Sequence, residues 1–324
     1  MDKVRNVFWN NREKRLRAGW RIFLQLTLNI VLILLLGTIV SNTLGLVIPP
    51  DVQGYVLAYP VMFVGTVLAV WLAGRFLDRR RFIDFGLTLS KREWWMDFTF
   101  GIILSTVPLL IILLALRGMG WIAIDGVFTS KLPGWPIALP LISAAAIYIC
   151  VGAFEEIARV YQMRNLLESV WARFGRWGAV CLAIGVAALI SIIMHLADLE
   201  FFPPVFLVYV LLDGIFLGLC YLVTGRAAIA IAMHFMVDFL FLIVFVPHTS
   251  AFFDGFVTLF NIRITHLAVT AFITTHMNSV VLVGLLVYEA VNLLALYFWV
   301  KMRYGKFSIS DNLAVPTLLH KSGG

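Results

Sequence analysis

Eight long apolar runs determine what this chain can fold into. Crossing the hydrocarbon core of a bilayer takes roughly 20 helical residues, and most of these runs are about that long. In lipid, every backbone N–H and C=O must be paired within the chain, so such runs form helices. We therefore predict an all-α polytopic membrane protein with spans at about residues 21–46, 55–77, 98–116, 137–167, 178–197, 204–223, 227–247 and 278–300.

The charge content supports a membrane protein. Only 13% of the 324 residues are charged, whereas a soluble domain has about 25%. We expect a single transmembrane domain over residues 21–300, after a basic N-terminal segment 1–20 and before a tail 301–324. The net charge is +7, but most Lys and Arg flank the apolar runs, as the positive-inside bias requires. The predicted partner is the lipid bilayer, and nucleic acid is not expected.

Basic and non-basic turns alternate along the chain. The N-terminus, the turn at about 75–92, the turn at 164–176, Arg226 and the stretch after residue 300 are basic. Because Lys and Arg accumulate in cytoplasmic loops, we expect both termini in the cytoplasm, and we expect the protein in the bacterial cytoplasmic membrane.

Two loop segments need a specific interpretation. The arginine-rich stretch 75–81 is interpreted as a turn that is solvated or bound to lipid headgroups. The aromatic and apolar segment 248–277 also carries charged residues and histidines. We interpret it as an interfacial helix or a re-entrant segment on the outer side.

Two adjacent carboxylates interrupt the fourth apolar run. Glu155 and Glu156 lie in Ala-Ile-Tyr-Ile-Cys-Val-Gly-Ala-Phe-Glu-Glu-Ile-Ala-Arg, which ends at Arg159. A charge within a span costs about 2.5–3.5 kcal/mol on insertion scales, so retained carboxylates indicate a polar site. Neighbouring helical residues point about 100° apart, and Arg159 can pair with either carboxylate. The simpler alternative is a self-neutralising Glu-Glu-Arg cluster where the span leaves the membrane.

Later apolar runs carry further polar residues. His234 and Asp238 lie one helical turn apart, so that the carboxylate can orient the imidazole, and we favour a functional role for this pair. His195 lies near the end of its span, where an interfacial role is the alternative. Asp213 is either a partner in the polar site or a satisfied interior carboxylate.

These motifs resemble those of the intramembrane CAAX-processing endopeptidases and bacteriocin-processing proteins, the Abi or CPBP family. The family signature is Glu-Glu-x-x-x-Arg, then Phe-x-x-x-His, then His-x-x-x-Asn or Asp. Here the first motif reads Val151-Gly-Ala-Phe-Glu-Glu-Ile-Ala-Arg, the second ends at His195, and Thr224-Gly-Arg-Ala-Ala-Ile-Ala-Ile-Ala-Met-His opens the third. The resemblance covers about residues 140–240 and implies the intramembrane CAAX-protease-like fold.

The resemblance also implies an activity, the hydrolysis of a peptide bond in a membrane-associated and possibly lipidated peptide or protein. It assigns roles to six residues: Glu155, Glu156, Arg159, His195, His234 and Asp238. Glu155 with His195 would activate a water molecule, His234 with Asp238 would stabilise the oxyanion, and Glu156 with Arg159 would brace the site. Donors to an oxyanion in a water-poor site are worth about 3 kcal/mol each.

The first motif is one residue shorter than the family pattern. Only Ile157 and Ala158 separate the second glutamate from Arg159. Either the helix lacks one residue, or the register is shifted and Phe154 stands where the family has its base. In the first case, one residue added before Arg159 would restore the family spacing.

The other two motifs depart from the family at one position each. Ser191 stands where the family usually has Phe before the histidine, and Asp238 stands where Asn is commoner. An ionised Asp cannot donate a hydrogen bond to an oxyanion. Asp238 must therefore be protonated, or it serves only to orient His234.

The pattern leaves two other functions open. One is a non-catalytic member of the family that binds peptides or confers bacteriocin immunity, which the short first motif favours. The other is a proton-coupled transporter, against which the lack of a detectable inverted repeat counts.

No metal or other cofactor is expected. The chain lacks the His-Glu-x-x-His spacing that places two zinc ligands and a base on one helix, and the Arg159 cation would compete with a metal ion. The alternative is a zinc ion held by Glu155, His195 and His234.

Overall fold

The computed structural model describes residues 7–11, 13–45, 50–130, 136, 138–196, 205–247, 257–266 and 279–314. Within this part of the chain, seven helices are long and apolar enough to cross a membrane. This finding confirms the predicted all-α polytopic membrane fold. The longest elements are α2 (Ala18–Thr43), α3 (Pro50–Leu72), α4 (Arg92–Gly118), α5 (Ala138–Met194), α6 (Val205–Thr224) and α9 (Ser279–Tyr304).

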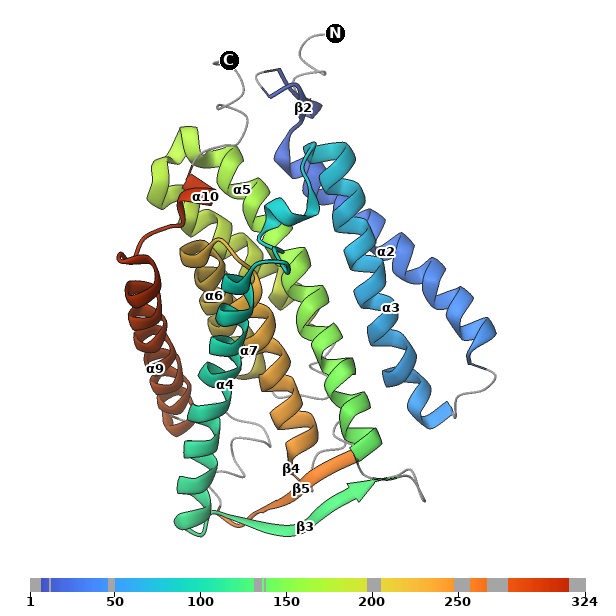
Figure 1. Ribbon diagram of the computed structural model, residues 1–324, viewed down its shortest axis with the longest axis vertical. Coiled ribbons are helices and arrows are strands. Elements are labelled where there is room, and N and C mark those ends of the chain that lie inside the picture. Colours follow the sequence, from blue (N-terminus) through green and yellow to red (C-terminus); the bar gives the residue numbers. More distant parts are fainter. Residues whose placement is uncertain are drawn as a thin grey trace.

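The helices form an elongated bundle with α2 and α3 at one side and α9 at the other (Figure 1). The short helix α7 (Ala228–Phe239) continues into η4 (Leu240–Val244) and packs against α4, α5 and α6. It lies within the predicted seventh span 227–247, but its 12 residues are fewer than the roughly 20 that a crossing takes. Because three helices surround α7, side chains on every face of it are held by neighbours.

Helix α5 is a hairpin of two spans, Ala138–Trp171 and Arg173–Met194. The chain reverses at Gly175, whose φ of 67° lies in the left-handed region that glycine adopts most readily. The second half returns beside the first and contributes a row of buried alanines to the same core: Ala179, Ala183 and Ala187.

Small residues let the helices approach closely. Gly214 and Gly218 form a Gly-x-x-x-Gly pattern on α6, of the kind that brings membrane helices together. A Cβ added at Gly218 would lie 3.3 Å from Met163 and 3.7 Å from Ile184, which belong to the two halves of α5. The α6 helix therefore packs in the groove between these halves.

The end of the bundle opposite α10 (Asp311–Ala314) is covered by a three-stranded sheet (Figure 1). In it β3 (Ile122–Ser130) pairs antiparallel with β5 (Val257–Ile264), which pairs parallel with β4 (Phe245–Pro247). The interpretation of 248–277 as an interfacial helix or re-entrant segment is thus wrong for 257–264. It lies outside the described residues for 248–256 and 267–278. The strand forms because Val257-Thr-Leu-Phe-Asn-Ile-Arg-Ile is rich in β-branched residues and finds a partner far away in the sequence.

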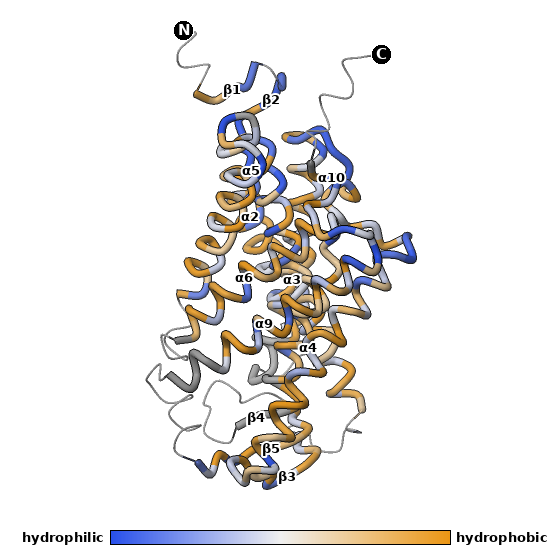
Figure 2. Tube along the Cα trace, turned by 90° about the vertical axis from the view of Figure 1, so that its left-hand side faces the viewer, coloured by the Kyte–Doolittle hydropathy of each residue, from blue (hydrophilic) through white to orange (hydrophobic). Residues whose placement is uncertain are grey.

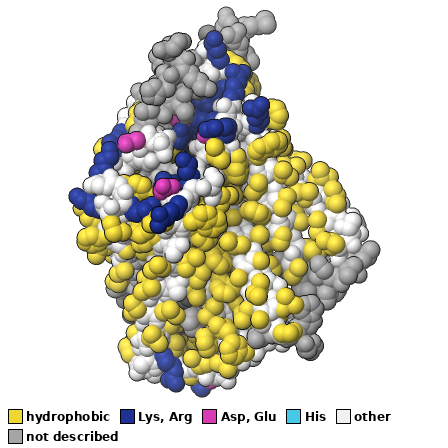
Figure 3. All heavy atoms as spheres, viewed as in Figure 1, with side chains coloured by type: hydrophobic (Ala, Val, Ile, Leu, Met, Phe, Trp, Pro, Cys, Tyr) yellow, Lys and Arg dark blue, Asp and Glu magenta, His cyan; other side chains and the backbone are white. Residues whose placement is uncertain are grey.

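Charge and hydropathy divide the molecule into zones. Polar residues concentrate at the end that carries the β1–β2 hairpin (Trp9–Asn10 and Arg15–Leu16) and α10 (Figure 2). On the face drawn in Figure 3, Lys and Arg gather at that same end, and hydrophobic side chains cover the body of the bundle. The protein is therefore an integral membrane protein with one strongly basic end.

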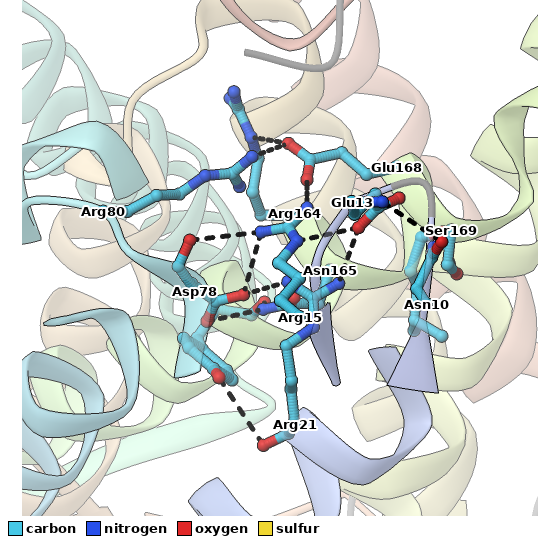
Figure 4. A network of polar contacts seen from close by, with 12 residues as sticks. Asn10, Glu13, Arg15, Arg21, Asp78, Arg80, Arg164, Asn165, Glu168 and Ser169 are labelled. Carbon is cyan, nitrogen blue, oxygen red and sulfur yellow. Dashed lines mark hydrogen bonds and ion pairs between the residues drawn. The ribbon is translucent and has the colours of Figure 1, made fainter. Parts of the chain in front are cut away.

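A buried ionic network closes the basic end (Figure 4). Glu168 of α5 accepts from Arg15 Nη2 at 3.0 Å and from Arg164 Nε at 3.0 Å, and it also pairs with Arg80. Asp78, at the end of η1 (Ala73–Asp78), pairs with Arg21 of α2. The network joins the N-terminal hairpin, α2, η1 and α5.

This network corrects the interpretation of 75–81 as a solvated turn. Arg75, Arg79 and Arg81 are exposed, but Asp78 and Arg80 are buried. Burial disfavours the charge of Arg15, yet the nearby carboxylates of Glu168 and Glu13 outweigh burial and raise the pKa of Arg15. The charges stay buried because each lies next to an opposite charge.

The network predicts a large effect of one neutral substitution. In Glu168→Gln, three guanidinium groups lose the carboxylate that they share, so we expect the free energy of unfolding to fall by about 3–5 kcal/mol. Thermal unfolding of the purified protein in detergent measures this effect. The control is Asp84→Asn, whose partner Arg81 has a side chain that is 76% exposed, and it should cost at most about 1 kcal/mol. Equal losses in both variants would contradict the prediction.

Candidate active site

The site begins with a close contact between two backbones. A Cβ added at Gly152 of α5 would lie 2.7 Å from the Phe235 backbone nitrogen and 2.9 Å from the Ile231 carbonyl oxygen of α7. On the opposite side of α7, a Cβ added at Gly101 of α4 would lie 2.7 Å from the Ile229 carbonyl oxygen. Only glycine leaves room for these approaches. They hold α7 so close to α5 that polar side chains one turn further along α5 reach it.

Both glutamates of the first motif reach His234. Its Nδ1 lies 3.0 Å from Glu156 Oε1, and its Nε2 lies 3.8 Å from Glu155 Oε2. The Asp238 carboxylate, one turn further along α7, is 3.7 Å from the same Nε2. An ionised carboxylate accepts hydrogen bonds only, so Nδ1 carries the proton of the contact with Glu156.

The two sides of the imidazole differ in accessibility. The Glu156 side chain on the Nδ1 side is fully buried, whereas those of Glu155 and Asp238 on the Nε2 side are 21% and 25% exposed. Glu156 therefore orients the ring, and the Nε2 face is the one open to a reacting group.

Glu156 also pairs with Arg159. The Arg159 Nε lies 2.9 Å from Glu156 Oε2, and both residues are buried. This buried carboxylate is thus shared by a guanidinium of its own helix and an imidazole of α7. Removing any one of the three would leave a buried charge without its partner.

The structure favours one of the two explanations for the short motif. Phe154 packs in an apolar cluster that includes Tyr148 and Phe235, whereas both glutamates face His234. Phe154 therefore does not occupy the position of the base. The insertion of one residue before Arg159 would have a second effect besides restoring the family spacing. It would turn Arg164 and Glu168 by about 100° relative to the preceding part of α5 and break the ionic network.

Glu156 on α5 and His234 on α7 lie at the same depth in the bundle, because each is about equally far along its helix from a common level. Arg164 donates to the Asn312 carbonyl oxygen at 2.8 Å, and a Cβ added at Gly225 would lie 3.6 Å from the Asn312 side chain. Arg164 and the turn before α7 are therefore level. Glu156 and His234 lie eight and nine residues from these points, which is about 12–13 Å in a helix. The glutamates lie near the middle of the helical stretch Ala138–Trp171. The alternative of a Glu-Glu-Arg cluster at the membrane exit stays open, because this stretch is longer than the roughly 20 residues of one crossing.

His195 lies at the same depth but outside the contacts of the group. Glu155 and His195 are each twenty residues from Gly175, and an antiparallel hairpin places such positions level. The His195 Nδ1 donates to the Ser191 carbonyl oxygen at 2.8 Å, which leaves Nε2 free of a proton in the neutral ring. The ring lies 5.9 Å from that of Phe206, and Asp238 is within electrostatic range. Among the described residues, no hydrogen bond joins His195 to Glu155.

Asp213 is the further polar residue that the structure adds to this group. It lies within electrostatic range of His234 and of Arg159. This placement favours the first of the two alternatives for Asp213, a partner in the polar site. Gly152 was not singled out from the sequence, although a glycine one turn before a buried Glu-Glu pair is a visible signal of close helix packing.

In the zinc alternative, Glu155, His195 and His234 would be the ligands, and a zinc site needs at least three ligands converging on one point. Within the described part of the chain, no group of three or more His, Cys, Asp or Glu side chains has a geometry that could hold a metal ion. The expectation that the protein uses no metal stays a prediction.

Fold and geometry together define a polytopic membrane protein with a buried glutamate–histidine cluster at helical contacts. Residues 137–240 match the family model described as Type II CAAX prenyl endopeptidase Rce1-like. This segment contains all six residues singled out from the sequence, and the match confirms the predicted resemblance. Over these residues the chain is similar to that family of CAAX prenyl endopeptidases. No curated protein and no solved structure matches the chain.

The contact at Gly152 predicts how the cluster can be disturbed without touching a charge. In Gly152→Ala, the added methyl group overlaps the α7 backbone, so we expect a loss of about 1–3 kcal/mol in unfolding free energy. The matched control is Gly185→Ala in the second half of α5, where an added Cβ meets nothing within 4 Å. Because Ala is the better helix former, this control should be neutral or slightly stabilising in the same thermal unfolding assay. The reverse order of stability would contradict the proposed packing.

Proposed function

We propose that this protein is an intramembrane endopeptidase that hydrolyses a peptide bond in a membrane-associated substrate, lipidated substrates included. The observation that carries the proposal is the contact of Glu155 and Glu156 with His234, inside the segment that matches the CAAX endopeptidase family. A cluster of this kind in a membrane interior is costly to maintain. A reaction that needs a base and an oxyanion donor accounts for that cost.

Glu155 is proposed as the general base. Its side chain is on the more accessible face of the cluster. There we propose that Glu155 and His195, which lies at the same depth, together bind the reacting water molecule. The oxygen of this water attacks the substrate carbonyl carbon, and its proton passes to Glu155. The proton is then returned to the amide nitrogen as the C–N bond breaks, so that a carboxylic acid and an amine leave the site.

His234 is proposed as the oxyanion donor. Its Nδ1–H is held by Glu156, so when Nε2 is also protonated it can donate to the oxygen that gains charge in the tetrahedral intermediate. Asp238 faces the same nitrogen and is proposed to orient the ring. Arg159 keeps Glu156 ionised and in place beside Nδ1.

This mechanism predicts the result of a single isosteric change. Glu155→Gln removes the proton acceptor and keeps the shape, so the turnover of a membrane-embedded peptide should fall about 10²- to 10⁴-fold while thermal stability is retained. Cleavage of prenylated and unprenylated CAAX peptides in liposomes by the purified protein is the measurement. Glu93→Gln, an exposed glutamate at the start of α4, is the control and should keep full turnover. Unchanged turnover in Glu155→Gln would exclude this residue as the base.

We also propose that the basic end of the bundle faces the cytoplasm of a bacterial cell, with both termini on that side. The positive-inside bias supports this orientation, because the ionic network and the exposed arginines Arg75, Arg79 and Arg81 share one end.

Cysteine labelling tests the orientation. In a variant lacking Cys150, Cys181 and Cys220, the new cysteine of Ser130→Cys on β3 should react with a membrane-impermeant maleimide in intact cells. The exposed positions Arg79 and Lys306, changed to Cys one at a time, should react only after the cells are lysed. Labelling of Arg79→Cys in intact cells would overturn the orientation.

A further inference from the structure

The guanidinium of Arg159 lies against the backbone of α6. A Cβ added at Gly214 would lie 3.0 Å from Arg159 Nη1 and 3.7 Å from Ala188. Arg159 is 5% exposed, so its charge is enclosed between the two halves of α5 and α6. Glycine at position 214 makes the room that the guanidinium occupies.

One side of this guanidinium is directed away from Glu156. The Arg159 Nε donates to Glu156 at 3.1 Å, but Nη1 has no hydrogen-bond partner among the described residues. The residue next to Gly214 is Asp213, a carboxylate within electrostatic range of Arg159. A buried cation is stable only when its surroundings supply opposite charge. Glu156 and Glu155 supply most of it for Arg159, and Asp213 is the contribution from α6.

Charged and titratable groups of four helices surround Asp213. From α7 these are His234 and Asp238, and from α5 Arg159, Glu156 and Glu155. Tyr209 and Cys220 come from α6 itself, and Tyr288 and Glu289 come from α9. His234 and Arg159 are the cationic groups in this set, and both belong to the candidate site.

The short first motif determines how this guanidinium is oriented. Arg159 lies three positions after Glu156 in the helix, so it reaches this glutamate through Nε, and Nη1 extends toward α6. The Asp213 carboxylate on α6 is within electrostatic range of this outer end, whereas Glu156 contacts the inner end directly.

We propose that Asp213 is a positioning residue that acts through Arg159. It attracts the guanidinium from α6 across a short distance without a direct hydrogen bond. Arg159 in turn pairs with Glu156, and Glu156 accepts from the Nδ1 of His234. This proposal rests on the proposed endopeptidase function, since the position of His234 matters for the oxyanion. It assigns to α6 a part in the site that the three sequence motifs do not include.

The test is a double-variant cycle with Asp213→Asn and Arg159→Gln. Asp213→Asn should lower kcat about tenfold with little change in KM and should alter the pH profile of kcat/KM. In the double variant the loss should be no larger than in Arg159→Gln alone, because residues that act as a unit are not additive. Asp213→Glu, which keeps the charge, should restore part of the lost turnover.

The matched control is Asp97→Asn on α4. Asp97 is a buried carboxylate that pairs with Arg226 at 2.9 Å, away from the site. This variant should lower the Tm but keep kcat and the pH profile. The proposal is overturned if Asp213→Asn behaves like this control, or if the losses of the two single variants multiply in the double variant.

The four proteins of the cycle are the wild type, the two single variants and the double variant. They also distinguish a failure of this proposal from a failure of the proposed function. The cycle is also measured as Tm in detergent, where Asp213→Asn should cost stability in the wild-type background but not in the Arg159→Gln background. If the wild type cleaves no peptide, the endopeptidase function and the positioning role both fail, and the Tm cycle still decides whether the two residues are coupled. Additive changes in Tm would reject the coupling even in an active enzyme.

Discussion

The contact between α5 and α7 at Gly152 is the constraint on which the site depends. A side chain at this position would separate the two helices, and the carboxylates one turn later would no longer reach the imidazole. Gly101 of α4 meets α7 from the other side in the same way. Close backbone packing therefore holds the short helix and positions the polar groups that it carries. In a membrane, van der Waals packing of small residues drives helix association.

The protein contains two buried groups of charges at different depths along α5. At the basic end, Glu168 and Asp78 neutralise arginines from four elements and fasten the N-terminal hairpin to α5. About three helical turns from Glu168 along α5, Glu156 is shared by Arg159 and His234. Both groups include residues of α5, so this helix connects them. The network supports the register of α5, and the register of α5 determines which side chains face α7.

Much of the fold and part of the site could be predicted from the sequence. Apolar runs located the helices, and the local spacing of Glu156 with Arg159, and of His234 with Asp238, anticipated real contacts. The errors have a common cause. The strand at 257–264 pairs with residues more than 120 positions earlier, and Arg80 is buried by Glu168, 88 positions away. Neither partner can be recognised from local composition, which in both places indicated a surface segment.

The sequence by itself determined that this chain is a helical membrane protein with a glutamate–histidine site, because lipid allows few backbone solutions and makes each retained charge conspicuous. Only the tertiary structure decided how the site is assembled. The reversal at Gly175 brings His195 level with Glu155 yet leaves it outside their group, and the glycines beside α7 bring Glu155 and Glu156 to one imidazole. Gly214 leaves the room on α6 that the Arg159 guanidinium occupies. These outcomes depend on distances between helices, which are set by the packing of small residues from separate spans and not by the pattern along any one of them.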